Sequence, residues 1–181
     1  MNTQKLRTRD LVYIAVLAAL MAVCAWIAIP TPWNVSYTLQ TMAVFLAVAL
    51  LGGRRGTLAV VVYILLGAVG LPVFSNFSGG IGKLIGPTGG YLFSYPLTAL
   101  AVALSVKLFK KRSVLSLSVG MTVGCLLSYT CGTLYYMAIG GVSLGAALAS
   151  CVVPFIWFDV LKIVFCTALG TLVGRRMEKN I

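Results

Sequence analysis

Long apolar runs separated by short basic clusters dominate this sequence. Runs of about 20 apolar residues are long enough to cross the hydrocarbon core of a bilayer as helices. We expect six such spans, at about residues 11–29, 37–51, 56–71, 91–109, 114–139 and 152–173. Only 9% of the 181 residues are charged, against about 25% in soluble proteins. The sequence therefore predicts an all-α integral membrane protein that forms a single membrane domain, residues 1–181.

The basic residues predict how the chain is oriented. Twelve of the fourteen Lys and Arg residues fall on one side if there are six spans. Of the other two, Lys83 falls on the opposite side and Lys162 within the last span. Because basic loops stay in the cytoplasm, we expect both termini to be cytoplasmic. The glycine-rich segment 72–90, between the third and fourth spans, should then face outward as a structured loop.

Charge and cysteine content exclude several functional classes. The net charge of +11 is not gathered on one soluble basic face, as nucleic-acid binding requires. There are five cysteines but no histidine and no CxxC pair, so we expect no metal site, no cofactor and no redox motif. The cysteines are interpreted as small apolar packing residues.

The loop 72–90 has the composition of a lid. A P-loop is excluded, because Phe77 stands where its first glycine belongs and Leu84 where its Ser or Thr belongs. What remains is a tightly folding, glycine-rich segment with an amide at Asn76 and aromatic rings at Phe74, Phe77 and Tyr91. An ordinary extracellular connection is the alternative.

Asp159 and Lys162 are the strongest candidates for a binding site. Asp159 is the one carboxylate within a long apolar stretch, and Lys162 follows it three residues later. A charge at the centre of a spanning helix costs roughly 2.5–3.5 kcal/mol, and residues three apart share a helix face. Both can therefore point into one cavity. Two simpler interpretations are a mutually neutralising pair, or a Lys162 that reaches to the membrane interface.

Two further features leave alternatives open. Gln40, near the outward end of the second span, could bind a ligand or tie two helices together. Small residues in the first span, at Ala15 and Ala19 and again at Ala18 and Ala22, permit close helix approach. That approach could be internal or to a partner protein.

Four segments in order make the chain resemble the BioY family. They are TLQT at 38–41, LGAVGLPVF at 66–74, GPTGGY at 86–91 and PFIWFDVLK at 154–162. The resemblance covers nearly the whole chain, although Trp157 and Phe158 stand where smaller residues are expected. BioY proteins are the biotin-capturing S components of energy-coupling-factor (ECF) transporters.

The resemblance implies a multi-pass protein of the prokaryotic plasma membrane that binds biotin from outside. Its implied partners are a transmembrane coupling subunit and two ATP-binding-cassette subunits, which hydrolyse ATP, so the chain itself is expected to be no enzyme. Carried over by position, Asp159 and Asn76 bind the ureido ring and Lys162 binds the valerate carboxylate. The bicyclic rings are expected to lie against Tyr91, Phe74 or Trp157.

The resemblance also turns Ala15 and Ala19 into the expected docking surface for the coupling subunit. An S component for another vitamin and a stand-alone biotin facilitator remain alternatives. A membrane-embedded enzyme is disfavoured, because metal-assisted or nucleophilic catalysis needs more carboxylates or histidines than this sequence places in its spans.

Overall fold

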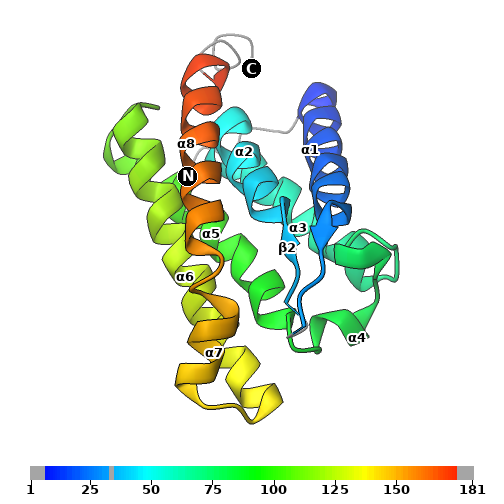
Figure 1. Cartoon of the computed structure of the whole chain (residues 1–181). Helices are drawn as coiled ribbons and strands as arrows, with labels where there is room; N and C mark the ends of the chain where they lie inside the picture. The colour runs from blue at the N-terminus through cyan, green and yellow to red at the C-terminus, as the bar shows by residue number, and fades with distance from the viewer. Residues whose placement is uncertain (1–6, 33–34, 175–181) are drawn as a thin grey trace.

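The structure, a computed structural model, describes residues 7–32 and 35–174, and most of them are helical (Figure 1). The longer helices are α1 (Thr8–Trp26), α2 (Gln40–Leu51), α3 (Gly53–Ala68), α5 (Gly89–Leu108), α6 (Val114–Gly140) and α8 (Ile156–Leu172). Short elements connect them, namely strands β1 (Ala28–Ile29) and β2 (Tyr37–Thr38), the 3-10 turn η1 (Ser75–Phe77), and helices α4 (Ile81–Leu84) and α7 (Leu144–Cys151).

Four chain segments meet at one end of the bundle, drawn at the top of Figure 1. They are the start of α1, the α2–α3 turn, the α5–α6 connection and the end of α8. Arg112 joins three of them, because its Nη1 donates to the carbonyls of Leu50 (3.2 Å) and Gly174 (3.1 Å). Arg55 on α3 forms a 3.1 Å ion pair with Asp10 on α1. We call this the basic end.

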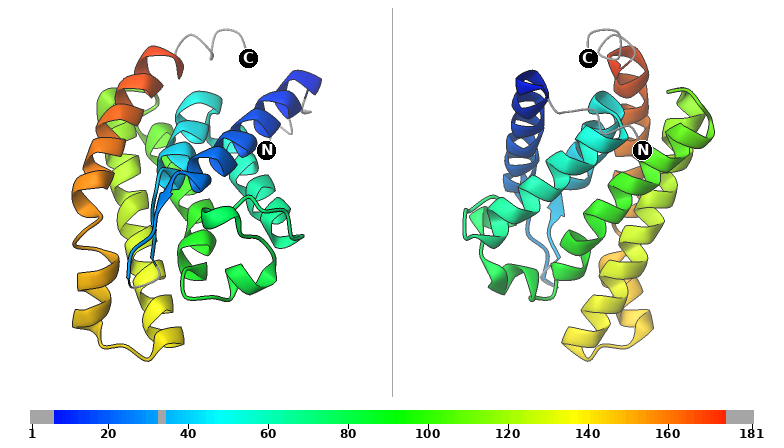
Figure 2. Two further views of the ribbon diagram at one scale, coloured as in Figure 1. Left: turned by 45° about the vertical axis from the view of Figure 1, so that its right-hand side comes forward. Right: turned by 180° about the vertical axis from the view of Figure 1, so that it is seen from behind.

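The opposite end carries the irregular segments, as Figure 2 shows. β1 and β2 pair as a short antiparallel ribbon, with Ala28 opposite Thr38. The glycine-rich segment between α3 and α5 contains η1 and α4 and packs on the end of α1. There the Trp26 ring stacks on Phe77 with centroids 5.1 Å apart, and the Trp26 indole N–H donates to the Pro72 carbonyl at 2.8 Å.

Glycines on α6 allow α5 to approach closely. Gly120 and Gly124 are one turn apart and face α5, where a methyl group on Gly120 would lie 2.8 Å from the Val102 Cα. At Gly124 the same group would lie 2.9 Å from the Thr98 side chain, whose hydroxyl donates to the Gly124 carbonyl at 3.0 Å. This small-xxx-small contact is the packing that transmembrane helices favour.

The helices agree with the predicted spans in position more closely than in length. α1, α5 and α6 are each long and apolar enough to cross a bilayer, and α7 with α8 qualifies as one span bent by 46°. α2 has 12 residues, about 18 Å at the usual rise, which is shorter than a hydrocarbon core of ~30 Å. Within residues 7–32 and 35–174, length and composition thus give three candidate crossings, or four if the bent pair is one span, in an α-helical membrane protein. The six-span count stays a prediction.

The last predicted span differs from the structure at its start. It was expected from residue 152, but α8 begins at Ile156 and a separate helix, α7, precedes the break. Residues 152–155 form turns. Pro154 explains the break, because it has no backbone N–H and its ring clashes with the preceding helical turn.

We predict that Gly124→Leu destabilises the fold. The added side chain would meet Thr98 on α5, and overpacking of this kind costs about 1–3 kcal/mol. Gly145→Leu is the control, because nothing lies within 4 Å of a methyl group at that position. Unfolding of both purified variants in detergent measures the difference. Equal midpoints for the two variants would contradict the close α5–α6 contact.

Candidate functional site

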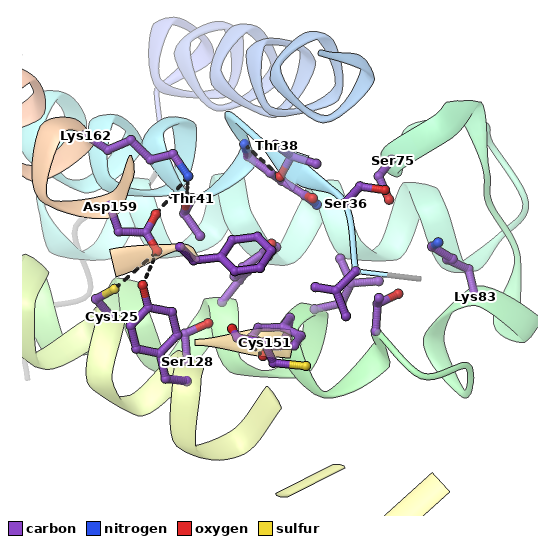
Figure 3. A pocket seen from close by; sticks show the side chains of 18 residues that line it. Ser36, Thr38, Thr41, Ser75, Lys83, Cys125, Ser128, Cys151, Asp159 and Lys162 are labelled. Carbon is purple, nitrogen blue, oxygen red and sulfur yellow. Dashed lines mark hydrogen bonds and ion pairs between the residues drawn. The ribbon is translucent and has the colours of Figure 1, made fainter. Parts of the chain in front are cut away.

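A cavity lined by polar and apolar side chains lies between the bundle and its irregular end (Figure 3). Its walls come from the segment preceding α2, from α2 itself, from the glycine-rich loop, and from α5, α6 and α8. The volume open to the centres of water-sized atoms is about 70 Å³, several times the ~10–15 Å³ that a single water needs. The cavity has room for a small molecule rather than a lone water.

Asp159 and Lys162 lie together at one end of the cavity. The Lys162 Nζ donates to Asp159 Oδ1 at 2.8 Å and to the Thr41 hydroxyl at 3.0 Å. Both side chains are buried, with exposed fractions of 5% for Asp159 and 6% for Lys162. The pair is in contact, as the mutually neutralising interpretation expects, and it also lines the cavity.

Two residues of α6 complete the surroundings of the carboxylate. The Tyr129 hydroxyl donates to Asp159 Oδ2 at 2.5 Å, and the Cys125 thiol approaches the same oxygen at 3.7 Å. Neither residue was predicted for the site. The available signal is their spacing of four residues, which places both on one face of a helix.

The pair retains unused hydrogen-bonding capacity. A carboxylate has about four acceptor positions and an ammonium has three donors. Asp159 receives bonds from Lys162, Tyr129 and the weak Cys125 donor, whereas Lys162 makes two bonds. Each therefore has a position left for a ligand. An amide or urea, which carries N–H donors beside a C=O acceptor, matches this arrangement.

Gln40 ties two helices together, which is one of the two interpretations that the sequence left open, and ligand binding by Gln40 stays a prediction. Gln40 lines the cavity, and its Nε2 donates to the Tyr63 hydroxyl at 2.5 Å. That hydroxyl in turn donates to the Val73 carbonyl in the loop at 2.9 Å. Gln40 thus ties α2 to α3 and connects the cavity wall to the glycine-rich loop.

The predicted aromatic contacts divide between cavity and core. Tyr91 lines the cavity, and its hydroxyl donates to the Cys151 carbonyl at 3.3 Å. Phe74 does not line it, because its ring is fully buried edge-on to Tyr63 with centroids 5.6 Å apart. Trp157 is 78% exposed on the outside of α8. Phe155, which sequence reasoning missed, lines the cavity and stacks on Tyr37.

Asn76 lies in η1 at the rim of the cavity. Its side chain is exposed, and its Nδ2 donates to the Ser36 hydroxyl at 3.3 Å. Ser36 and the neighbouring Ser75 line the cavity. Asn76 has a left-handed backbone with φ of 58°, a conformation that asparagine tolerates better than most residues.

Lys83, from α4, also lines the cavity and lies at the end opposite Lys162 in Figure 3. Partial burial lowers the pKa of its ammonium group from the ordinary value. Among residues 7–32 and 35–174, no three His, Cys, Asp or Glu side chains are grouped closely enough to hold a metal ion.

The two small-residue pairs of α1 face in different directions. Ala18 and Ala22 are buried, whereas Ala15 and Ala19 are exposed. Internal packing therefore uses the first pair. The second pair lies on an open face of α1 with exposed apolar neighbours such as Leu11 and Val16.

The fold and the cavity define an α-helical membrane protein that encloses a pocket containing a buried ion pair. Its sequence matches the BioY family over residues 1–179. The chain belongs to that family.

Individual proteins agree with this assignment. The chain is 40% identical to the biotin transporter BioY of Thermotoga maritima over 171 residues, which cover 94% of this chain and 96% of that one. It is 32% identical to the biotin transporter BioY2 of Lactococcus lactis over 175 residues, which cover 97% and 95% of the two chains. A crystal structure of the S component for biotin from an ECF-type ABC transporter superimposes with a TM-score of 0.85 at 26% identity, covering 99% of this chain and 94% of that one.

We predict that Lys162→Met destabilises the protein by about 3–5 kcal/mol, because it leaves the Asp159 carboxylate buried without its cation. The double variant Asp159→Leu with Lys162→Met should recover most of that loss, since no unpaired charge remains. Unfolding midpoints in detergent measure both. A double variant that is as unstable as the single one would contradict a charge-pairing origin for the loss.

Proposed function

We propose that this chain is the substrate-capture subunit of a biotin uptake system, binding biotin outside the cell and delivering it with an ATP-driven coupling module. The observation that carries the proposal is the buried Asp159–Lys162 pair, which lines the cavity with bonding positions to spare. Membership of the BioY family supports biotin as the ligand. The chain itself acts by binding, and ATP hydrolysis belongs to partner subunits.

The ureido ring of biotin suits the Asp159 end of the cavity. One of its two N–H groups can donate to the acceptor position that Asp159 has left, and its carbonyl can accept the remaining N–H of Lys162. The bicyclic rings are apolar and fit beside Tyr91 and Phe155, which line the walls. We expect Asn76, at the rim of the cavity, to contact the ligand from the loop. Gln40 forms part of the cavity wall.

The proposed orientation puts the basic end in the cytoplasm and the cavity end outside. Arg7, Arg9 and Arg54 belong to segments that meet at the basic end, together with Lys107–Arg112. An excess of basic residues marks the cytoplasmic side. The predicted C-terminal cluster at 175–179 lies outside the described residues. With six spans, the glycine-rich loop then faces the outside of the plasma membrane, where biotin enters.

The exposed face of α1 is the proposed contact with the transmembrane coupling subunit, which would in turn join two ATP-binding-cassette subunits. Ala15 and Ala19 are exposed there, and small residues allow a second helix to approach within close packing distance. Ala18 and Ala22, by contrast, already pack inside the bundle. Docking on this face leaves the cavity free.

We predict that the purified protein binds biotin and that Asp159→Asn weakens this binding by at least about 2 kcal/mol, or roughly thirtyfold, the scale for truncating one member of a buried charged contact. The matched control is Asp10→Asn, because Asp10 pairs with Arg55 at the basic end and should leave affinity unchanged. Isothermal titration of both variants, alongside thiamine as a second ligand, measures the effect.

Folded protein without saturable biotin binding would overturn the proposed function. Tight binding of thiamine instead would assign the chain to another vitamin. Wild-type affinity in the Asp159→Asn variant would remove Asp159 from the site while leaving biotin capture intact.

We predict that Ala15→Trp spares biotin binding but impairs uptake when the coupling subunits are present, because the bulky ring prevents close approach of a partner helix. Ala168→Trp serves as control, since Ala168 is an exposed alanine on α8. Titration of each purified variant and uptake of labelled biotin by cells that express the whole system separate the two effects. Normal uptake by the Ala15→Trp variant would exclude this docking face.

A further inference from the structure

The cavity contains one more positive than negative side chain. Three charged residues line it, namely Asp159, Lys162 and Lys83. The first two form a 2.8 Å ion pair and neutralise each other. Lys83 therefore gives the cavity a net charge of +1 that no other lining residue balances. In a setting of low dielectric constant, such an excess favours a ligand with one negative charge.

Lys83 has no acidic partner within the described part of the chain. The acids there are Asp10 and Asp159, and each already faces a cation, Arg55 for the first and Lys162 for the second. Lys83 is nevertheless half-buried rather than extended into solvent. Burial lowers the pKa of its ammonium group, which means that the charged form lacks compensation in its present surroundings.

The position of Lys83 is fixed by its backbone. The Gly80 N–H, just before α4, donates to the Gly67 carbonyl at the end of α3 at 2.7 Å. Leu84 is buried, and a side chain on Gly89 would collide with the Leu84 carbonyl. The four-residue helix α4 is thereby held between α3 and α5. Figure 3 shows Lys83 at the opposite end of the cavity from Lys162, with Ser36 and Ser75 between them.

We propose that Lys83 binds the anionic end of the ligand, so that the cavity recognises a molecule with an uncharged hydrogen-bonding group at one end and a carboxylate at the other. This inference rests on the proposed function, and for biotin it assigns the valerate carboxylate to Lys83. Lys162 is left to act with Asp159 on the ureido ring.

The alternative assignment of the carboxylate to Lys162 has an electrostatic disadvantage. Lys162 already forms a 2.8 Å ion pair with Asp159. A second anion beside it would place two buried negative charges around one cation. Either the ligand or Asp159 would then be uncompensated, which is strongly unfavourable in a buried site. Lys83 accepts an anion without breaking any ion pair of the described chain.

The test compares biotin with biotin methyl ester, which keeps the rings and removes the charge. Isothermal titration of both ligands into the wild-type protein and the Lys83→Gln variant should show that the variant binds biotin about tenfold more weakly. Binding of the ester should be unchanged within about twofold, the scatter that such a comparison tolerates. The Lys83→Arg variant should restore the preference for the acid. Lys111→Gln is the matched control, because Lys111 is exposed in the α5–α6 connection at the basic end.

The outcomes separate the inference from the function on which it rests. If Lys83→Gln lowers the affinity for biotin and for the methyl ester equally, Lys83 only supports the loop. If the wild type binds the acid and the ester equally, the site does not recognise the negative charge of the ligand. Either result overturns the inference while biotin capture stands. Wild-type protein that binds neither ligand would overturn both.

Discussion

The ion pair between Asp159 and Lys162 is the interaction around which the bundle is arranged. Both residues belong to α8, but Lys162 reaches Thr41 on α2 and Asp159 receives the Tyr129 hydroxyl from α6. Three helices are therefore tied at one buried point. Removing two charges from water costs several kcal/mol per ion unless the geometry and the additional hydrogen bonds are good. The donors around Asp159 supply those bonds, and the same low dielectric makes any remaining position attractive to a polar ligand.

The glycine-rich loop is attached to this site through the core rather than across the surface. Phe74 fills the space above Gly67, where no side chain could be accommodated beside its ring. The chain of hydrogen bonds from Gln40 through Tyr63 to the Val73 carbonyl joins a lining residue of the cavity to the loop. Because a buried donor that loses its partner is costly, these two bonds hold the cavity wall and the loop together.

Hydropathy located most of the helices, and the cost of membrane charge pointed to Asp159 and Lys162, which meet in the cavity. The features that sequence reasoning missed leave weaker patterns in the sequence. Pro154 stood in an apolar run, so its effect on the helix path was hidden by hydropathy. A tyrosine such as Tyr129 hardly lowers the apolar character of a span, and nothing in its spacing shows that its hydroxyl meets a carboxylate. An aromatic loop residue such as Phe74 has no periodicity that distinguishes a ligand contact from a core anchor. In α1 the spacing of small residues predicted two faces suited to close packing, and only the structure showed that the face with Ala18 and Ala22 is the buried one.

The distribution of basic residues bears on both the membrane orientation and the binding of a ligand. Insertion favours Lys and Arg on the cytoplasmic side, and in the proposed orientation the basic end follows that preference. Lys83 departs from it, since α4, to which it belongs, lies at the opposite end of the bundle (Figure 1). A lysine there adds nothing to orientation and is partly desolvated without an acidic partner in the described chain. In the proposed site, an anionic ligand that enters the cavity compensates this charge, and ligand binding and the retention of the lysine are then parts of the same electrostatic balance.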